Sequence, residues 1–222
     1  MRRNSIFTKR WVKGSAVLVA TAATLVFASP QQAIATPLKG VDSATVSQSA
    51  SNVVDIDFAD GIKGRITFLE DGIFRYNVDP KGEFSEYATP RSKSHTAKIQ
   101  AQPDTSDTYS KPSATVVDKG DTIEITGGKA TVILDKATGK MSIKSGDRVV
   151  VSESASLDLD KKGTVQTLAK AKSENFFGGG TQNGRFLHTN QTIAISNTNN
   201  WTDGGVASPN PFYWTSDGYG VL

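Results

Sequence analysis

The feature that most limits the fold of this chain is a series of short runs in which apolar and polar residues alternate. Such strand-like runs occupy residues 53–58, 65–69, 73–78, 122–126, 130–134, 141–144 and 148–151. Alternation with a period of two places every second side chain on the same face of a β-strand. Asp71-Gly72 and Gly127-Gly128 separate neighbouring runs, and such pairs favour the tight turns of β-hairpins. The pattern predicts a domain built from β-hairpins.

The spacing of these runs favours one β-architecture over others. Short strands separated by regular turns, here also at residues 135–139 and 145–147, are typical of a β-sandwich. Residues 164–173 show a weak helical periodicity, and residues 88–115 are polar enough to form a long connection. We therefore expect an all-β fold of the β-sandwich type over residues 52–222.

Residues 1–35 have the composition of an export signal. Basic residues precede a run rich in alanine and aliphatic side chains, and Ala33-Ile34-Ala35 provides a cleavage sequence. The apolar run is short for a membrane span, and an uncleaved anchor is the alternative. We expect a disordered or helical signal peptide over residues 1–35, followed by a flexible spacer over residues 36–51.

The charge and cysteine content narrow the classes of partner. The chain has 25 basic residues, of which five lie in the leader, so the 20 that remain face 22 acidic residues. The basic character therefore belongs to the export signal and gives no support for binding nucleic acid or, after cleavage, a membrane. No cysteine is present, so no disulfide holds the fold. Export without cysteine favours a secreted or cell-surface protein of a Gram-positive bacterium.

A glycine-rich run at residues 178–184 superficially resembles a phosphate-binding loop. It lacks the G-x-G-x-x-G spacing, and no Lys-Ser or Lys-Thr pair follows it. A tight turn that shapes a cleft is the better interpretation. No nucleotide cofactor is expected.

The acidic and histidine residues do not form a recognisable metal motif. Asp55 and Asp57, like Asp158 and Asp160, have the i, i+2 spacing that would place two carboxylates on one face of a strand. The solvated face of an edge strand is the simpler explanation, and no metal is expected. His95 and His188 are isolated in the sequence, although His188, close to Arg185, could make a polar contact in a cleft.

Residues 176–222 differ in composition from the rest of the chain. They hold eight glycines, six asparagines and three charged residues, together with Trp201 and Trp214. Asparagine and glycine tolerate left-handed backbone angles, and aromatic rings offer flat apolar faces. Loops of this composition suit a sugar better than a phosphate or a metal.

An aromatic cluster within this segment has two possible roles. Trp201, Phe212, Tyr213 and Trp214 fall within fourteen residues, beside two prolines that restrict the backbone. The rings could be a hydrophobic plug beneath a loop, or they could be the wall of a ligand site. The spacing leaves both alternatives open.

Two stretches carry a resemblance to a known family: Phe176-Phe177-Gly178-Gly179-Gly180-Thr181-Gln182-Asn183-Gly184-Arg185-Phe186, and Asn200-Trp201-Thr202-Asp203-Gly204-Gly205-Val206-Ala207-Ser208-Pro209-Asn210-Pro211-Phe212-Tyr213-Trp214. They resemble glycoside hydrolase family 31, and more narrowly its branch of bacterial α-N-acetylgalactosaminidases. Residues 217–222 resemble the strand that follows in that family. Residues 122–151 resemble its N-terminal galactose-mutarotase-like β-sandwich.

The resemblance implies a supporting role for this domain. Family members are retaining α-glycosidases or transglycosylases. In them a (β/α)₈ barrel follows the β-sandwich, and two aspartates of that barrel carry out catalysis. No aspartate of this chain matches either position, so no catalytic residue is assigned. The sandwich is expected to lend a loop to the rim of the pocket for an α-linked glycoside, of N-acetylgalactosamine or glucose. The candidate rim residues are Asn183, Arg185, Asn200, Trp201, Asp203 and Tyr213.

A barrel of this kind needs roughly 250 residues. The chain is therefore expected to be a fragment cut before its catalytic barrel, which would be its main partner, and to be inactive alone. A stand-alone carbohydrate-binding module and a structural cell-surface protein are the alternatives.

Overall fold

The computed structural model describes residues 44–84, 108–160, 163–182, 185–195 and 206–222. The predicted signal peptide and most of the connection predicted at residues 88–115 lie outside these ranges. The described residues are almost entirely β-structure, with one short 3₁₀ turn at Ala59–Gly61. The predicted all-β fold is confirmed.

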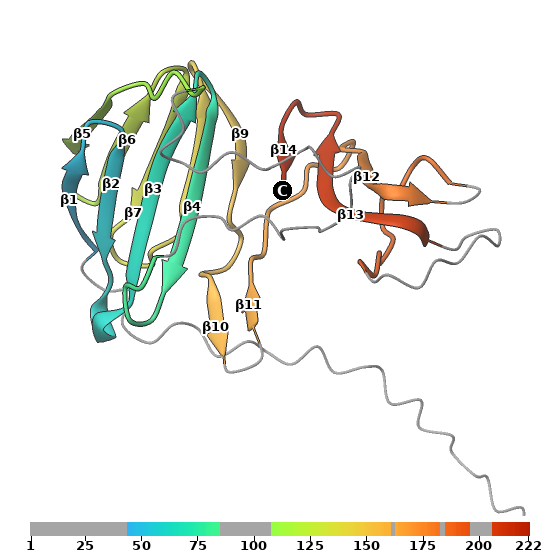
Figure 1. Ribbon diagram of the computed structural model, residues 1–222, viewed down its shortest axis with the longest axis horizontal. Helices are drawn as coiled ribbons and strands as arrows, with labels where there is room; N and C mark the ends of the chain where they lie inside the picture. Colours follow the sequence, from blue (N-terminus) through green and yellow to red (C-terminus); the bar gives the residue numbers. More distant parts are fainter. Residues whose placement is uncertain (1–43, 85–107, 161–162, 183–184, 196–205) are drawn as a thin grey trace, which may run out of the picture. The chain divides into compact units, whose positions relative to one another are not determined.

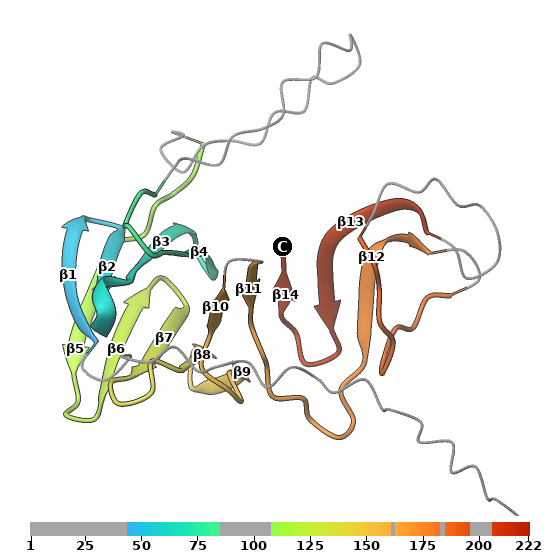
Figure 2. The ribbon, with the colours of Figure 1, turned by 90° about the horizontal axis from the view of Figure 1, so that it is seen from below.

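Two antiparallel sheets form the body of the domain and lie face to face (Figures 1 and 2). The first has the order β1(Thr45–Ala50), β2(Val53–Asp57), β3(Lys63–Glu70), β4(Ile73–Asp79). The second has the order β5(Ala114–Asp118), β6(Thr122–Gly127), β7(Ala130–Asp135), β8(Met141–Ser145), β9(Arg148–Ser152). Because spatial order follows chain order in both sheets, each is a meander of hairpins.

One hydrophobic core lies between the two sheets. Its fully buried side chains come from alternate positions of the central strands: Val54, Ile56, Ile66, Phe68, Ile125, Val132 and Leu134. The ring of Phe68 on β3 reaches the opposite sheet at Gly127 on β6, where a Cβ atom would lie 2.3 Å from its Cγ atom. The missing side chain at position 127 is thus what admits the phenyl ring.

The predicted hairpin turns are confirmed. Gly72, Gly128, Gly139 and Gly146 all have positive φ angles in the turns between consecutive strands. Two of these turns also contact each other: Asp71 accepts a hydrogen bond of 2.7 Å from the amide of Lys129, whose Nζ atom lies 2.6 Å from the same carboxylate. The tips of the β3–β4 and β6–β7 hairpins are therefore tied together across the sandwich.

Two expectations for the strand boundaries were wrong. Residues 45–50 of the predicted spacer form β1, which pairs with β2. β1 is an edge strand with mostly exposed polar side chains, so it carries no apolar alternation to reveal it. Residues 164–173 form no helix: β11(Gly163–Val165) pairs with β10(Asp158–Asp160), and Leu168 forms a bridge with Glu153.

Asp55 and Asp57 are explained by cross-strand ion pairs. Each lies opposite a basic residue of β3, with Asp55 2.6 Å from Arg65 Nε and Asp57 2.6 Å from Lys63 Nζ. Partly exposed pairs of this kind stabilise a sheet modestly. Among the described residues, no group of three His, Cys, Asp or Glu side chains is placed to hold a metal ion.

A third sheet follows the sandwich, with the order β12(Phe176–Gln182), β13(Val206–Thr215), β14(Gly220–Val221). The guanidinium group of Arg148, on β9, donates two hydrogen bonds of 3.0 Å to the carbonyl oxygen of Asp217, in the β13–β14 turn. No helix in the described part of the chain is both long and apolar enough to cross a membrane.

Gly127→Ala should lower the free energy of unfolding by about 1–3 kcal/mol, because the new methyl group would overlap the ring of Phe68. Urea denaturation measures the change. Phe68→Leu removes the ring. Gly127→Ala should therefore lower the free energy of unfolding less in a Phe68→Leu chain than in the wild-type chain. Strict additivity of the two substitutions would contradict this packing.

Glu153 should make the domain less stable as the pH rises. Burial raises the pKa of its carboxyl above the ordinary value of 4.5, although Gln166 and the Met141 amide donate hydrogen bonds to it. The folded state therefore holds this proton more tightly than the unfolded state, and its contribution declines from about pH 4.5 upward. Glu153→Gln should remove that decline in urea denaturation curves measured between pH 4 and 8.

A control of opposite sign is available at Asp118. The ion pair with Lys136 lowers the pKa of Asp118 below 3.8, so its contribution is lost as the pH falls through that region. Asp118→Asn should lower stability above about pH 4, and this loss should shrink as the pH falls below 3.8 through the lowered pKa. The same pH dependence for both variants would contradict the two assignments.

Candidate functional site

The glycine run of β12 lets this strand approach β13 unusually closely. Gly178, Gly179 and Gly180 have φ angles of 115°, 78° and 84°, which L-amino acids with side chains rarely adopt. A Cβ atom at Gly180 would lie 2.0 Å from the carbonyl oxygen of Ser208, and one at Gly178 would lie 2.5 Å from that of Phe212. The run is thus part of a paired strand, and the register between the two strands shifts within it.

The aromatic side chains of this sheet divide between its two faces. Phe177 lies opposite Trp214, and their rings stack at a centroid distance of 5.9 Å. Phe212 also stacks with Trp214, at a centroid distance of 5.9 Å, and the ring of Phe186 contacts that of Phe177 at 5.2 Å. These four side chains, Phe186, Phe177, Trp214 and Phe212, form a continuous aromatic row. Alternation along β13 directs Tyr213 to the opposite face, where its ring meets that of Phe176 at 6.1 Å.

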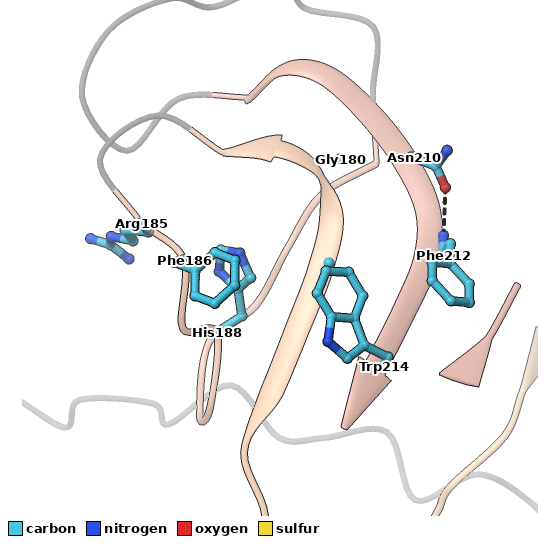
Figure 3. A pocket seen from close by; sticks show the side chains of 8 residues that line it. Gly180, Arg185, Phe186, His188, Asn210, Phe212 and Trp214 are labelled. Atoms are coloured by element: carbon cyan, nitrogen blue, oxygen red, sulfur yellow. Dashed lines mark hydrogen bonds between the residues drawn. The ribbon is translucent and has the colours of Figure 1, made fainter. Parts of the chain in front are cut away.

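A pocket of about 270 Å³ lies beside the aromatic row (Figure 3). Its lining residues are Gly178, Gly180, Arg185, Phe186, His188, Asn210, Phe212 and Trp214. Three of the eight are aromatic, and the polar ones are a guanidinium, an imidazole and an amide. The pocket therefore joins flat apolar surface to a few hydrogen-bonding groups.

The polar side chains of the pocket are held by local contacts. Arg185 donates a hydrogen bond of 2.9 Å to Gln191, and Asn210 accepts one of 2.8 Å from the amide of Phe212. His188 is only 7% exposed, and its amide donates to the carbonyl oxygen of Phe176 at 2.8 Å. This hydrogen bond fixes the segment after β12 against the start of that strand.

The exposure of the rings distinguishes a ligand wall from a hydrophobic plug. Trp214 is 39% exposed, Phe212 is 41% exposed and Phe186 is 72% exposed. A plug beneath a loop would bury its rings almost completely. These three rings are therefore not a buried plug.

The sequence prediction of the site overlaps with this pocket only in part. Arg185 lines the pocket, as does His188, for which the sequence suggested a contact in a cleft. Tyr213 lies half-buried on the opposite face of the sheet. The other four predicted rim residues lie outside the described part of the chain: Asn183, Asn200, Trp201 and Asp203. Their role, and that of Tyr213, stays a prediction.

Phe186, Asn210, Phe212 and Trp214 were not predicted as site residues. The aromatic cluster itself was visible in the sequence, but its division between two faces was not. A strand assignment for residues 206–215 would have grouped Phe212 with Trp214 and separated both from Tyr213.

Gly180→Ala should disrupt the β12–β13 pairing, because its methyl group would overlap the backbone of Ser208 at a φ angle of 84°. We expect a loss of about 1–3 kcal/mol in the free energy of unfolding, and a red shift of tryptophan emission as Trp214 becomes more exposed. Thr181→Ala, at the exposed neighbouring position, is the matched control and should change neither quantity appreciably. Equal effects of the two substitutions would contradict the close approach of the strands.

Solved structures of several glycosidases resemble this chain. The family 31 dextranase of Flavobacterium johnsoniae, complexed with isomaltotriose, matches with a TM-score of 0.58 and 16% identity, over 82% of this chain and 22% of the dextranase. The cycloalternan-forming enzyme of Listeria monocytogenes, in complex with a pentasaccharide substrate, matches with a TM-score of 0.60 and 14% identity, over 81% and 17%. The family 31 α-xylosidase of Xanthomonas citri matches with a TM-score of 0.52 and 21% identity, over 82% and 18%.

These identities establish a common fold, and the chain spans about a fifth of the length of these enzymes. No curated protein matches the sequence in a direct comparison. The family described as the glycosyl hydrolase 31 N-terminal galactose mutarotase-like domain, however, matches residues 63–222, which is well over half of the chain. The chain therefore belongs to the N-terminal galactose mutarotase-like domain family of glycoside hydrolase family 31.

Proposed function

We propose that this domain is the N-terminal β-sandwich of a secreted retaining α-glycosidase, which it serves by supporting a catalytic (β/α)₈ barrel and forming part of the wall of the sugar pocket. The observation that carries the proposal is the pocket beside the exposed aromatic row, in a domain of family 31. The row and the pocket lie on one face of β12 and β13.

The chemistry of the pocket suits a sugar ring. The C–H face of a pyranose packs on aromatic rings, while its hydroxyl groups need hydrogen-bonding partners at the edge of the ring. Trp214 and Phe212 supply the aromatic rings. The hydrogen-bonding partners are Arg185, His188 and Asn210.

The proposed ligand is an α-linked glycoside of the glucose or N-acetylgalactosamine type. The glucose assignment is supported by the dextranase structures, one complexed with isomaltotriose and one with glucose. A related α-xylosidase from a soil metagenome is complexed with xylose. The N-acetylgalactosamine assignment rests on the sequence resemblance of residues 176–186 and 200–214 alone.

The catalytic groups are proposed to come from the barrel. Retaining hydrolysis needs two carboxyl groups about 5–5.5 Å apart across the scissile bond. In the described part of this chain several acidic side chains already serve the fold, with Asp55, Asp57, Asp71 and Asp118 paired to basic residues. We therefore propose a supporting role for this domain.

The 222-residue chain is expected to leave nitrophenyl α-glucoside and nitrophenyl α-N-acetylgalactosaminide unhydrolysed, because transition-state stabilisation would require the carboxylates of the barrel. Release of nitrophenol, followed by absorbance, measures this directly. Turnover above the buffer rate that persists through purification would refute the supporting role.

Sugar titration separates this proposal from that of a stand-alone carbohydrate-binding module, which the exposure of the aromatic row also suits. A partial wall contacts one side of a ligand, so calorimetry with glucose, galactose, N-acetylgalactosamine or isomaltotriose should show little or no binding to the chain alone. A complete module would instead show saturable binding that Trp214→Ala abolishes. Tyr76→Phe, on β4 of the sandwich, is the control and would leave such binding intact.

The coding DNA provides an independent test. Because the related enzymes are roughly four to five times as long as this chain, the proposal expects a barrel-coding region next to this one, in the same or a shifted reading frame. Neighbouring DNA without such a region would favour the module or a structural surface protein.

A further inference from the structure

The side chains that line the pocket beside the aromatic row offer more hydrogen-bond donors than acceptors. Arg185 has several N–H donors and no acceptor, and the indole of Trp214 has one donor and no acceptor. The imidazole of His188 can both donate and accept. None of the eight described residues that line the pocket carries a carboxylate or a hydroxyl group. The pocket is therefore poor in groups that could accept a proton from a ligand.

Asn210 adds to this excess of donors. Its Oδ1 atom accepts a hydrogen bond of 2.8 Å from the amide of Phe212 (Figure 3). Because a backbone N–H group can only donate, the atom that faces it must be the oxygen, and the amide nitrogen of Asn210 is left to donate elsewhere. The carbonyl end of this side chain is thus committed to the backbone.

The charge at the pocket has the sign that these donors imply. Residues 176–222 contain three charged side chains: Arg185, Asp203 and Asp217. Arg185 lines the pocket, Asp217 lies in the β13–β14 turn, and Asp203 lies outside the described part of the chain. The ion pairs of the described residues all lie in the sandwich, and none of them includes Arg185. The described wall of the pocket therefore carries a positive charge without a paired carboxylate.

The guanidinium group is nevertheless held in place. Arg185 donates a hydrogen bond of 2.9 Å from Nη1 to Gln191, which is a neutral partner and leaves the charge intact. The other N–H groups of the planar fork keep the geometry that matches a carboxylate. Arg185 thus combines a fixed position with an uncompensated charge.

The size of the pocket and its aromatic rings suit one sugar unit. The volume of about 270 Å³ is close to the lower end, roughly 300 Å³, of the range for small-molecule sites. Trp214 and Phe212 are 39% and 41% exposed, so both present apolar surface on which a pyranose ring can pack.

A neutral sugar would be matched only in part by such a pocket. Each hydroxyl group brings an oxygen that accepts and a proton that must be donated, and the lining side chains accept few protons. A carboxylate only accepts, and an arginine fork binds it through two parallel N–H···O hydrogen bonds. The donor excess and the positive charge therefore favour a sugar that carries a carboxylate.

We propose that this pocket binds an acidic pyranose, a glucose-type ring that carries a carboxylate, and that Arg185 is the residue that selects it. The ligand so defined rests on the proposed function and narrows it, because glucuronic acid is the glucose ring with a carboxylate at C6. The ring packs on Trp214 and Phe212, while its carboxylate accepts hydrogen bonds from Arg185. Asn210 donates to a ring hydroxyl oxygen.

Nuclear magnetic resonance of the 222-residue chain tests the proposal. The indole N–H resonance of Trp214, assigned through its loss in Trp214→Phe, reports on the pocket. Titration with sodium glucuronate should shift this resonance and saturate in the millimolar range, as suits a partial wall. Glucose, which lacks the charge, and sodium acetate, which lacks the ring, should shift it little at the same concentrations. Added sodium chloride should weaken the response to glucuronate, because it screens the charge of Arg185.

Variants at position 185 test the selecting residue. Arg185→Gln should weaken glucuronate binding by about tenfold or more, because it removes a charge-assisted hydrogen bond. Arg185→Lys keeps the charge but loses the fork, so it should weaken binding less than Arg185→Gln. Lys144→Gln, on β8 of the sandwich, removes the same charge elsewhere and is the matched control. Unchanged backbone amide spectra would show that all three variants are folded.

Several results would overturn the proposal. An equal response to glucose would exclude selection by charge, and an equal response to N-acetylgalactosamine would show that a neutral carbonyl group suffices. An equal response to acetate would indicate a site for small anions without selectivity for a sugar. The absence of any response to glucuronate would also count against it. Each of these results leaves the supporting role to be judged separately, by the hydrolysis of nitrophenyl glycosides.

Discussion

The two sheets of the sandwich depend on a core packed closely enough to require a glycine. The phenyl ring of Phe68 occupies the space that a side chain at position 127 would fill, so β3 and β6 pack directly against each other there. The other fully buried residues, such as Ile56 and Val132, fill the rest of the same layer. The position of Phe68 against Gly127 also fixes the faces of β3 and β6, because a shift of one residue would turn their buried side chains outward.

The strands after the sandwich rely on a second absence of side chains. Gly178 and Gly180 let β12 approach the backbone of β13, and the stacked rings of Phe177 and Trp214 lie next to this close approach. Arg148 reaches from the sandwich to the β13–β14 turn. The sheet that carries the aromatic row thus depends on glycines that allow its strands to approach each other, and it is hydrogen-bonded to an arginine of the sandwich.

The sequence predicted the sandwich well because hairpin signals are local. The pairs Asp71-Gly72 and Gly127-Gly128 predict a turn and, with it, the end of one strand and the start of the next. Both hairpins are found as expected. β1 was not predicted, because this edge strand of mostly exposed polar residues is held by backbone hydrogen bonds to β2. Backbone hydrogen bonds do not require an alternation of apolar and polar side chains. The helical periodicity of residues 164–173 was too weak to outweigh the pairing of β10 with β11.

The pocket was predicted less completely, for a different reason. The sequence identified the right segment and two of its lining residues, Arg185 and His188, but the pocket depends on which side chains share a face. That depends in turn on the register of β12 and β13, which shifts twice within the glycine-rich stretch.

The two-faced arrangement of β13 has a practical consequence for protein engineering. Positions 212 and 214 line the pocket, while the ring at position 213 lies on the opposite face of the sheet, against Phe176. A combinatorial library randomised at 212 and 214, with 213 held constant, would sample new recognition surfaces while sparing the scaffold beneath them. The side chains proposed to contact the sugar and the side chain that packs on the opposite face thus alternate along one short gene segment, so the two can be varied separately.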